Sequence, residues 1–508
     1  MASRRDELNA YIFAKRRTLA AFVQPSPSGS EEGAPRPLRG VLPGLIVGVI
    51  VLAVFGAWGM FKPAAVPGWD KPKEHVIIAS DSTTRYVVLR THGDRQLHPV
   101  LNMASAKLLL DDGKGDVINV DESVLDNGTI PHGATIGIPY APDRMPSSSE
   151  AGTAKRWAAC ERQVQGGRAI QKAAFVLAAR DEKKTDGRER LRGGELLYVV
   201  GPDHMRYVVD ARGTAYRVSA KDELLARTLV GSDHTPQRVS ARWLETLHRG
   251  DPITFPKVPG TPGDSAEVPG LRDPAVNRVG MVLRANNGDR MQHYVVLPGR
   301  VAPVSDFTAT LLLSSRSLAH LGQPGRARDI SAGAFTPATE DFDARYAWPT
   351  EKPSSADDDS PGRGGRTTVC NVLRRVDADS GRTTLSTWAG SDFPADLPTG
   401  SSSAYVTPGS GQLYRHFLGS ETEAGTVFLV TDTGLRYAMQ SNSDSATDDE
   451  GIGTSARQRK RERQEARQAQ TRLGYGDAEV TPVPAAWSNL LPTGPRLSTA
   501  AARQPQGS

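Results

Sequence analysis

The chain has 508 residues, of which 62 are Lys or Arg and 57 are Asp or Glu, so its formal net charge at pH 7 is only +5. These charges are spread along the chain with few aromatic residues between them, which excludes the concentrated basic patch expected of a nucleic-acid-binding protein. The mean hydropathy is -0.41, yet hydrophobic residues make up 38% of the chain, which is enough to build several folded domains.

The first segment, residues 1–24, is predicted to be a cytoplasmic amphipathic helix. Ser3 can cap it, two acidic residues fall in its first turn, and its apolar residues recur near helical spacing. Its basic face would lie on anionic lipid, dock to a cytoplasmic partner, or remain solvated. The residues of this face are Arg4, Arg5, Lys15, Arg16 and Arg17. Residues 25–40, rich in Pro, Ser and Gly, are predicted to be a flexible linker.

Residues 41–61 form an uninterrupted run, VLPGLIVGVIVLAVFGAWGMF, without one ionisable side chain. A helix of that length spans about 30 Å, the thickness of the hydrocarbon core of a bilayer, so the run is predicted to be a single transmembrane helix. A buried core helix or the apolar part of a signal peptide is the alternative, but the run is long for either. Gly44 and Gly48 form a G-x-x-x-G pair, and Ala53 and Ala57 repeat this small-residue spacing, which would let a second helix approach closely.

The only two cysteines, Cys160 and Cys370, both follow the apolar run. Two cysteines on one side of a membrane are most economically explained by one disulfide in an oxidising compartment, and two unrelated buried thiols are the alternative. Basic residues are moderately enriched before the run, as expected of a cytoplasmic segment. Together these features predict a cell-membrane protein with a cytoplasmic N-terminus and a large C-terminal domain outside the cytoplasm.

A hairpin pattern occurs four times after the apolar run. Each copy has an apolar strand, a polar turn and a second strand centred on a tyrosine: HVIIASDSTTRYVVL, LLYVVGPDHMRYVVD, VGMVLRANNGDRMQHYVVL and TVFLVTDTGLRYAMQ. Arg precedes the tyrosine in three copies and His293 does so in the other. These hairpin residues are Arg85, Tyr86, Arg206, Tyr207, Tyr294, Arg436 and Tyr437. Each hairpin is followed by a segment predicted to be a third strand and one or two helical turns: QLHPVLNMASAKLLL, TAYRVSAKDELLARTL, RVAPVSDFTATLLLS and EVTPVPAAWSNLLP.

The patterns together predict a single-pass membrane protein with a β-rich α+β extracytoplasmic domain, in which four hairpin-plus-helix repeats surround a central β core. The predicted repeats cover residues 75–140, 193–256, 277–345, and 412–440 with 473–495. The core would come from residues 157–192 and 366–405, which a Cys160–Cys370 bridge would join. Residues 441–472 are predicted to be an insertion that is either solvated or in contact with acidic cell-envelope polymers, and residues 496–508 a tail.

The sequence contains no recognisable catalytic, cofactor or metal motif. The nearest approach to a phosphate-binding loop, GRGGRTT at residues 362–368, has Arg where the lysine belongs and the wrong glycine spacing. The ten histidines lack metal-ligand spacing, and no G-x-S-x-G motif is present. We therefore expect no cofactor and no enzymatic activity. A scaffold of a membrane complex is the favoured interpretation, and a membrane-anchored wall-binding module or hydrolase is the alternative.

Several segments resemble the EccB family of type VII (ESX) secretion systems of actinobacteria. They are the leader SRRDELNAYIFAKRR, the run ending GMFKP, the hairpin from WDKPKEHVII to RYVVL, QLHPVLNMASAKLLL, and LGYGDAEVTPVPAAWSNLLPTGPRLS. The resemblance implies a membrane-core subunit with one span, four extracytoplasmic repeats and one disulfide. It also implies self-association, assembly with the EccC ATPase, EccD, EccE and the mycosin protease, and export of small helical proteins. Some family members are labelled ATPases, a label that no motif in this sequence supports.

Overall fold

The computed structural model describes residues 3–23, 38–60, 65–164, 169–232, 234–288, 290–356, 365–398, 403–439 and 456–506. Most of the predicted linker, the first part of the predicted insertion up to residue 455, and the first residues of GRGGRTT lie outside the described residues. The chain divides into two units, Met1–Pro67 and Gly68–Ser508, and each is described by itself.

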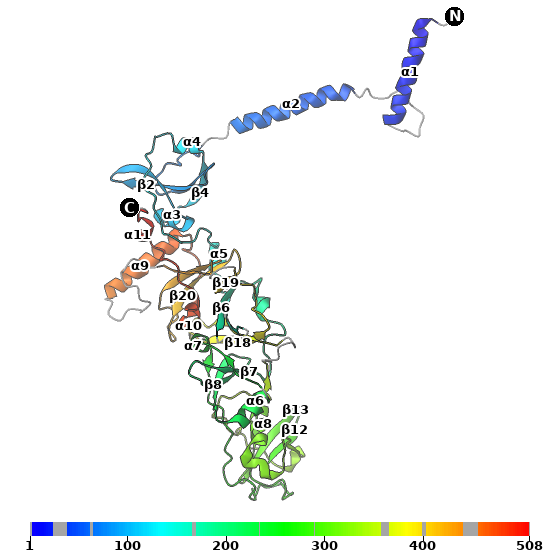
Figure 1. Cartoon of the computed structure of the whole chain (residues 1–508), viewed down its shortest axis with the longest axis vertical. Helices are drawn as coiled ribbons and strands as arrows, with labels where there is room; N and C mark the ends of the chain where they lie inside the picture. Colours follow the sequence, from blue (N-terminus) through cyan, green and yellow to red (C-terminus); the bar gives the residue numbers. More distant parts are fainter. Residues whose placement is uncertain are drawn as a thin grey trace. The chain divides into compact units, whose positions relative to one another are not determined.

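The first unit contains two helices, α1 (Arg4–Val23) and α2 (Leu38–Met60), both labelled in Figure 1. Side chains in α2 are described for residues 41–57, and its large apolar side chains are exposed, Leu52 by 74% and Phe55 by 71%. A Cβ added at Gly44 or Gly48 would meet no atom within 4 Å. Among the residues that the structure describes, no helix is both long enough and apolar enough to cross a membrane.

The large apolar side chains of α1 are not cleanly separated from its charged ones. Tyr11, Ile12 and Phe13 are consecutive and exposed, and consecutive residues in a helix are rotated by about 100° from one another. Leu8 and the basic Lys15 are seven residues apart, which puts an apolar and a charged side chain on nearly the same face. A basic residue therefore interrupts the apolar side of α1, and the amphipathic helix expected for residues 1–24 stays a prediction.

The described residues of the second unit form five β-sheets. Their strands are β1 (His75–Ala79), β2 (Arg85–Thr91), β3 (Asp94–Pro99), β4 (Asp116–Val120), β5 (Arg156–Gln163), β6 (Ile170–Leu177), β7 (Glu195–Val200), β8 (Arg206–Val209), β9 (Thr214–Val218), β10 (Gln237–Arg238), β11 (His248–Arg249), β12 (Val282–Asn287), β13 (Arg290–Leu297), β14 (Arg300–Val304), β15 (Arg328–Asp329), β16 (Ser354–Ser355), β17 (Thr368–Val376), β18 (Thr383–Gly390), β19 (Ala404–Val406), β20 (Gly411–Phe417), β21 (Val427–Thr431), β22 (Arg436–Ala438) and β23 (Thr481–Pro484).

Short helices connect and cover these strands. The α-helices are α3 (Met103–Leu109), α4 (Glu122–Leu125), α5 (Ser148–Ala151), α6 (Glu223–Val230), α7 (Ala241–Glu245), α8 (Asp306–Ser314), α9 (Ala456–Arg472), α10 (Ala485–Ser488) and α11 (Thr499–Ala502). The 3₁₀ turns are η2 (Glu182–Thr185), η3 (Arg316–Leu321) and η4 (Ala332–Ala334). Side-chain caps start most of the α-helices in this unit; for example, Asn102 accepts from the Ser105 N–H at α3, and Ser305 accepts from the Thr308 N–H at α8.

Four of the sheets share one strand order. Three antiparallel strands follow one another, and a fourth strand lies parallel beside the first: β3-β2-β1-β4, β9-β8-β7-β10, β14-β13-β12-β15 and β22-β21-β20-β23. We call these the first, second, third and fourth sheets, in chain order. The second sheet also carries β11 and β16. The same topology thus arises four times from segments that are unevenly spaced in the sequence.

The turn that leads into each tyrosine strand contains one residue with left-handed backbone. This residue is Thr83 (φ 57°), His204 (φ 60°), Gly288 (φ 63°) or Gly434 (φ 79°). Glycine adopts this conformation at no steric cost, whereas other residues are strained in it by about 1 to 2 kcal/mol. Thr83 and His204 are therefore unfavourable choices for their turns.

The segments that follow the predicted hairpins differ in the last copy. In the first three sheets they form β3, β9 and β14, which pair antiparallel with the tyrosine strand. In the fourth sheet the segment forms β23, which pairs in parallel with β20 and not with the tyrosine strand β22. The predicted strand and helical turn form here too, as β23 and α10, but β23 pairs with the additional strand β20 that residues 411–417 supply.

The fifth, central sheet has the order β18-β17-β5-β6-β19. Side chains alternate across a strand, so Trp157 and Ala159 of β5 point to one face while Ala158 and Cys160 point to the other. The face with Trp157 packs in one hydrophobic cluster with both the second sheet and the fourth sheet. The face with Cys160 is covered by residues that follow β18, including Phe393.

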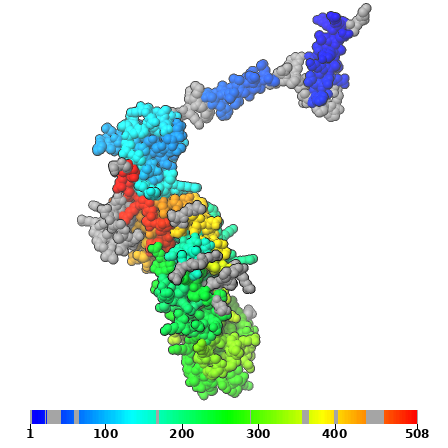
Figure 2. Space-filling model, viewed as in Figure 1, coloured from blue at the N-terminus to red at the C-terminus, as the bar shows by residue number. Residues whose placement is uncertain are grey.

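Further clusters join the remaining sheets to this centre. The first sheet packs with the fourth, and residues near the C-terminus join them, such as Leu497 and Ala502. Figure 2 shows this contact as red atoms against cyan ones. The second sheet packs against α8 of the third-sheet region through Phe307 and Leu311. The second unit is consequently held together by contacts between segments that are hundreds of residues apart.

Replacing both cysteines with alanine should lower the free energy of unfolding by about 4 to 5 kcal/mol in the chain-entropy description, because the Cys160–Cys370 bridge closes a loop between residues 210 apart. Denaturant unfolding of the detergent-solubilised chain, followed by tryptophan fluorescence, would measure the loss. The single variant Cys160→Ala should lose a similar amount, since it also breaks the bridge. A loss below about 1 kcal/mol would contradict the prediction.

Candidate functional site: a basic pocket beside the disulfide-linked core

The disulfide lies inside the central sheet. Cys160 on β5 and Cys370 on β17 are directly opposite each other in the antiparallel register, with their Cα atoms 4.1 Å apart. Both side chains are buried, at 1% and 0% exposure. The bond is therefore shielded from solvent and joins the two sequence segments that form the middle of the sheet.

The residue after Cys160 makes the closest polar link between the central sheet and the second sheet. Glu161 is only 4% exposed, and its carboxylate accepts hydrogen bonds from the Ser240 backbone N–H (2.7 Å) and hydroxyl. Ser240 also caps α7 by accepting from the Trp243 N–H. Burial raises the pKa of the Glu161 carboxyl, although the Ser240 hydrogen bonds and the charge on Lys172 act in the opposite direction.

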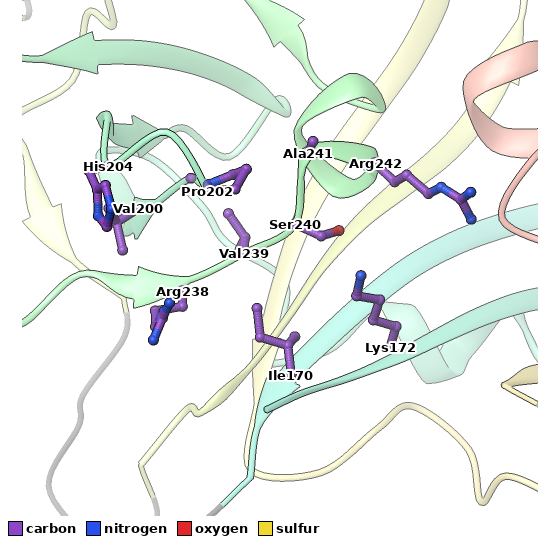
Figure 3. Close-up of a pocket in the computed structure, with 11 residues that line it drawn as sticks. Ile170, Lys172, Val200, Pro202, His204, Arg238, Val239, Ser240, Ala241 and Arg242 are labelled. Atoms are coloured by element: carbon purple, nitrogen blue, oxygen red, sulfur yellow. The ribbon is translucent and has the colours of Figure 1, made fainter. Parts of the chain in front are cut away.

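A pocket of about 680 Å³ opens beside this link. Four side chains that are cationic or can become so line it, each from a different element: Lys172 from β6, His204 from the β7–β8 turn, Arg238 from β10 and Arg242 from α7. Figure 3 shows Lys172 and Arg242 on one side of Val239, with Arg238 and His204 on the other. The pocket thus carries positive charge at both ends.

The hairpin residues predicted from the sequence are not brought together in one site. The hairpin residues of each copy belong to a different sheet and make contacts there. Arg85 donates to Asp143 (2.5 Å), and Arg206 donates to the Tyr198 hydroxyl (3.0 Å). The rings of Tyr86 and Tyr294 pack edge-on against His132 and Phe335, respectively. Tyr207 packs against the central cluster.

Arg436 and Tyr437 are the most deeply buried of these pairs. The Arg436 guanidinium, in a residue only 4% exposed, donates to Ser488 Oγ (2.8 Å) and Asn489 Oδ1 (3.0 Å). The Tyr414 hydroxyl shares a hydrogen bond with the same Ser488 (2.9 Å), and burial raises the pKa of Tyr414 to about 12. This network fixes α10 against the fourth sheet, so its role is structural.

Within the described residues, no group of three or more His, Cys, Asp or Glu side chains is arranged to hold a metal ion. The basic pocket was missed by sequence reasoning because its cations come from residues 172, 204, 238 and 242, with no motif spacing between them. The predicted basic residues of α1 and the small residues of α2 lie in the first unit, on helices that the structure describes.

A family model described as "Type VII secretion system ESX-1, transport TM domain B" matches residues 1–507. The match covers nearly the whole chain and defines a transport protein of type VII secretion. The chain belongs to the EccB family, and this confirms the resemblance seen in the sequence.

Curated relatives and solved structures agree with this assignment. The chain is 26% identical to the ESX-3 secretion system ATPase EccB3 of Mycolicibacterium smegmatis, over 91% of this chain and 82% of the relative. It is 25% identical to the ESX-1 secretion system ATPase EccB1 of the same species, over 63% of each chain. The fold resembles a chain of the intact ESX-5 inner membrane complex, with a TM-score of 0.56 at 20% identity, covering 100% of this chain and 96% of that one. It also resembles the EccB3 dimer from the ESX-3 core complex, with a TM-score of 0.55 at 22% identity, covering 84% and 99%.

The prediction that the chain has no enzymatic activity is contradicted by these relatives, which are named ATPases at 25 and 26% identity. The prediction depended on the absence of a phosphate-binding-loop motif. That motif describes one way to bind phosphate, and a pocket assembled from distant residues leaves no such pattern in the sequence.

We expect the contribution of Glu161 to the free energy of unfolding to depend on pH. Because the pKa of Glu161 is raised in the folded state, its stabilising contribution is fully present below the unfolded pKa of about 4.3 and is lost as the pH rises through the raised pKa. Glu161→Gln keeps an acceptor for Ser240 but cannot titrate. Relative to this variant, the wild type should therefore gain stability as the pH falls through that window.

Thermal unfolding midpoints across a pH series would test this expectation. The exposed Glu340→Gln serves as the matched control, because it removes a carboxyl from another part of the second unit. Parallel pH profiles for the wild type and Glu161→Gln would show that Glu161 does not titrate differently in the folded and unfolded states.

Proposed function

We propose that this chain is a structural subunit of a type VII secretion core complex, contributing to its assembly and to the export of small helical proteins. The observation that carries the proposal is the family match over residues 1–507. The EccB-like fold of the second unit supports it, since that unit aligns with chains of ESX membrane complexes.

The membrane anchor in this proposal is residues 41–61, with the N-terminus in the cytoplasm and residues 68–508 outside it. Support comes from the absence of ionisable side chains in this run and from the exposed apolar side chains of α2. The buried Cys160–Cys370 disulfide supports the outside location, because disulfides persist in oxidising compartments. The basic residues of α1 would then meet the anionic cytoplasmic leaflet.

We also propose that the first four sheets are copies of one repeat around the central sheet, with the boundaries predicted from the sequence. Their common strand order and the left-handed residue in each turn support a common origin. The fourth copy would be a modified one, because its tyrosine strand β22 lies at the edge of its sheet, whereas β2, β8 and β13 each lie between two other strands.

The proposed partners are further copies of this chain, the EccC ATPase, EccD, EccE and the mycosin protease. The structural neighbours support assembly, since one is described as an EccB3 dimer from the ESX-3 core complex and another as part of an intact ESX-5 inner membrane complex. Gly44 and Gly48 on one side of the helix, and Ala53 and Ala57 on the opposite side, would offer close-packing faces to partner helices in the membrane.

ATP hydrolysis is a second candidate function, and it is favoured by the names of the curated relatives. It is compatible with the first, because a subunit that is built into a complex can also turn over nucleotide.

The first proposal predicts that the tagged chain, extracted in mild detergent from its own membranes, migrates on a native gel as a large complex. Mass spectrometry should find a multidomain ATPase and a multispanning membrane protein in it. Gly44→Leu combined with Gly48→Leu should reduce the complex at least about tenfold, because bulky side chains keep helices apart. Gly56→Leu, which lies on another face of α2, is the control and should leave it intact. A monomer or simple dimer in the wild type would overturn the proposal.

The second candidate predicts phosphate release from magnesium ATP by the purified full-length chain in detergent. The rate should exceed the protein-free background by at least about tenfold and saturate with ATP. A rate equal to that of the same preparation after heat denaturation would overturn the candidate. Phosphate release that persists after denaturation does not need the folded protein.

A further inference from the structure

We propose that the basic pocket between the central and second sheets binds an oligophosphate group, such as the phosphate chain of a nucleotide or inorganic polyphosphate. The proposal concerns binding alone. It does not depend on ATP hydrolysis by the chain, and it assigns a ligand class to a site that no motif marks.

The charge of the pocket is the first argument. Lys172, Arg238 and Arg242 are exposed, and within the part of the chain that the structure describes none of them forms an ion pair. The carboxylate of Glu161 is buried and held by Ser240. Asp203, in the same turn as His204, accepts from the Met205 N–H. Lys172 lies opposite Glu161 in the β5–β6 pairing and offsets its charge, so Arg238 and Arg242 are the pocket cations without a carboxylate partner among the described residues. Such cations attract and orient an anion.

The shape of the pocket is the second argument. Its volume of about 680 Å³ lies within the range of roughly 300 to 1,000 Å³ typical of small-molecule sites. The cations stand at the two ends of the pocket in Figure 3. The apolar side chains of Ile170, Val200 and Pro202 also line the pocket. An extended ligand with several anionic groups can reach both ends, whereas a single small anion can reach only one.

The backbone of His204 is the third argument. Its turn, between β7 and β8, has this residue in the left-handed region, and the corresponding turn between β12 and β13 of the third sheet uses Gly288 for it. Histidine is strained at this position, and strained residues concentrate at functional sites. The imidazole lines the pocket, which provides a reason for a histidine where glycine would fit the turn better.

The chemistry of the cations narrows the ligand class. Guanidinium groups match phosphate oxygens with two parallel hydrogen bonds, and Lys binds phosphate as a point charge. A phosphate monoester carries about −1.5 to −2 charges at pH 7, so neutralising one lysine and two arginines takes about two phosphate groups. A chain of linked phosphates supplies this charge over the length of the pocket.

Isothermal titration calorimetry of the full-length chain in detergent would test the proposal. The probes are inorganic tripolyphosphate, magnesium ATP, AMP and orthophosphate. We expect tripolyphosphate to bind at least about tenfold more tightly than orthophosphate or AMP. Its affinity should fall when the NaCl concentration rises from about 50 mM to about 500 mM, since salt screens exposed charges. If ATP and tripolyphosphate bind with equal affinity, the pocket contacts only the phosphate groups. If ATP binds more tightly, the pocket also contacts the nucleoside.

Variants connect binding to the pocket. Arg238→Gln combined with Arg242→Gln should weaken tripolyphosphate binding at least about tenfold, and Lys172→Gln should weaken it by a smaller factor. Arg249→Gln, an exposed cation on the same sheet but outside the pocket, is the matched control and should bind as the wild type does.

His204→Gly separates binding from folding. Glycine relieves the left-handed strain, so the melting temperature should stay the same or rise while tripolyphosphate binding weakens. Thr83→Gly makes the same backbone change in the first sheet and should leave binding unaltered. Absence of tripolyphosphate binding, equal binding of orthophosphate, or wild-type binding by the double arginine variant would overturn the proposal. Failure of ATP hydrolysis alone would overturn only the second candidate function.

Discussion

The pairing of β5 with β17 is the constraint on which the rest of the second unit depends. These strands are separated by more than two hundred residues of sequence, and the Cys160–Cys370 disulfide fixes them directly opposite each other. Since a one-residue slip of a strand would exchange its two faces, the bridge also fixes which side chains point to which neighbour. Trp157 is thereby directed to the cluster shared with the second and fourth sheets.

That shared cluster explains how one central sheet holds together the second and fourth sheets, which are far apart in the sequence. Trp243 of α7, from the middle of the sequence, and Trp487 of α10, from its C-terminal part, reach the same face. Trp243 donates to the Ala159 carbonyl (3.0 Å), and Trp157 donates to Gln412 (2.9 Å), so the apolar contact is pinned by directional bonds. A rigid junction of this kind gives the pocket beside α7 a fixed geometry, which a specific binding site needs.

Membership of the EccB family puts this architecture in the setting of type VII secretion. The relatives named ATPases require an explanation in a chain without a phosphate-binding loop. The pocket lined by Lys172, Arg238 and Arg242, with the ligand we propose for it, would offer one, because phosphate recognition depends on where cations lie in space and not on their order in the sequence.

The sequence by itself determined the features that depend on local chemistry. Hydrophobic patterning and turn residues identified the hairpins around Tyr86 and Tyr207, and the resemblance of the terminal segments identified the family. Only the tertiary structure decided what depends on distant partners. It joined β23 to β20, because a strand pairs with the edge available to it. It also gathered the pocket cations from four elements, since folding brings together side chains that no local pattern connects.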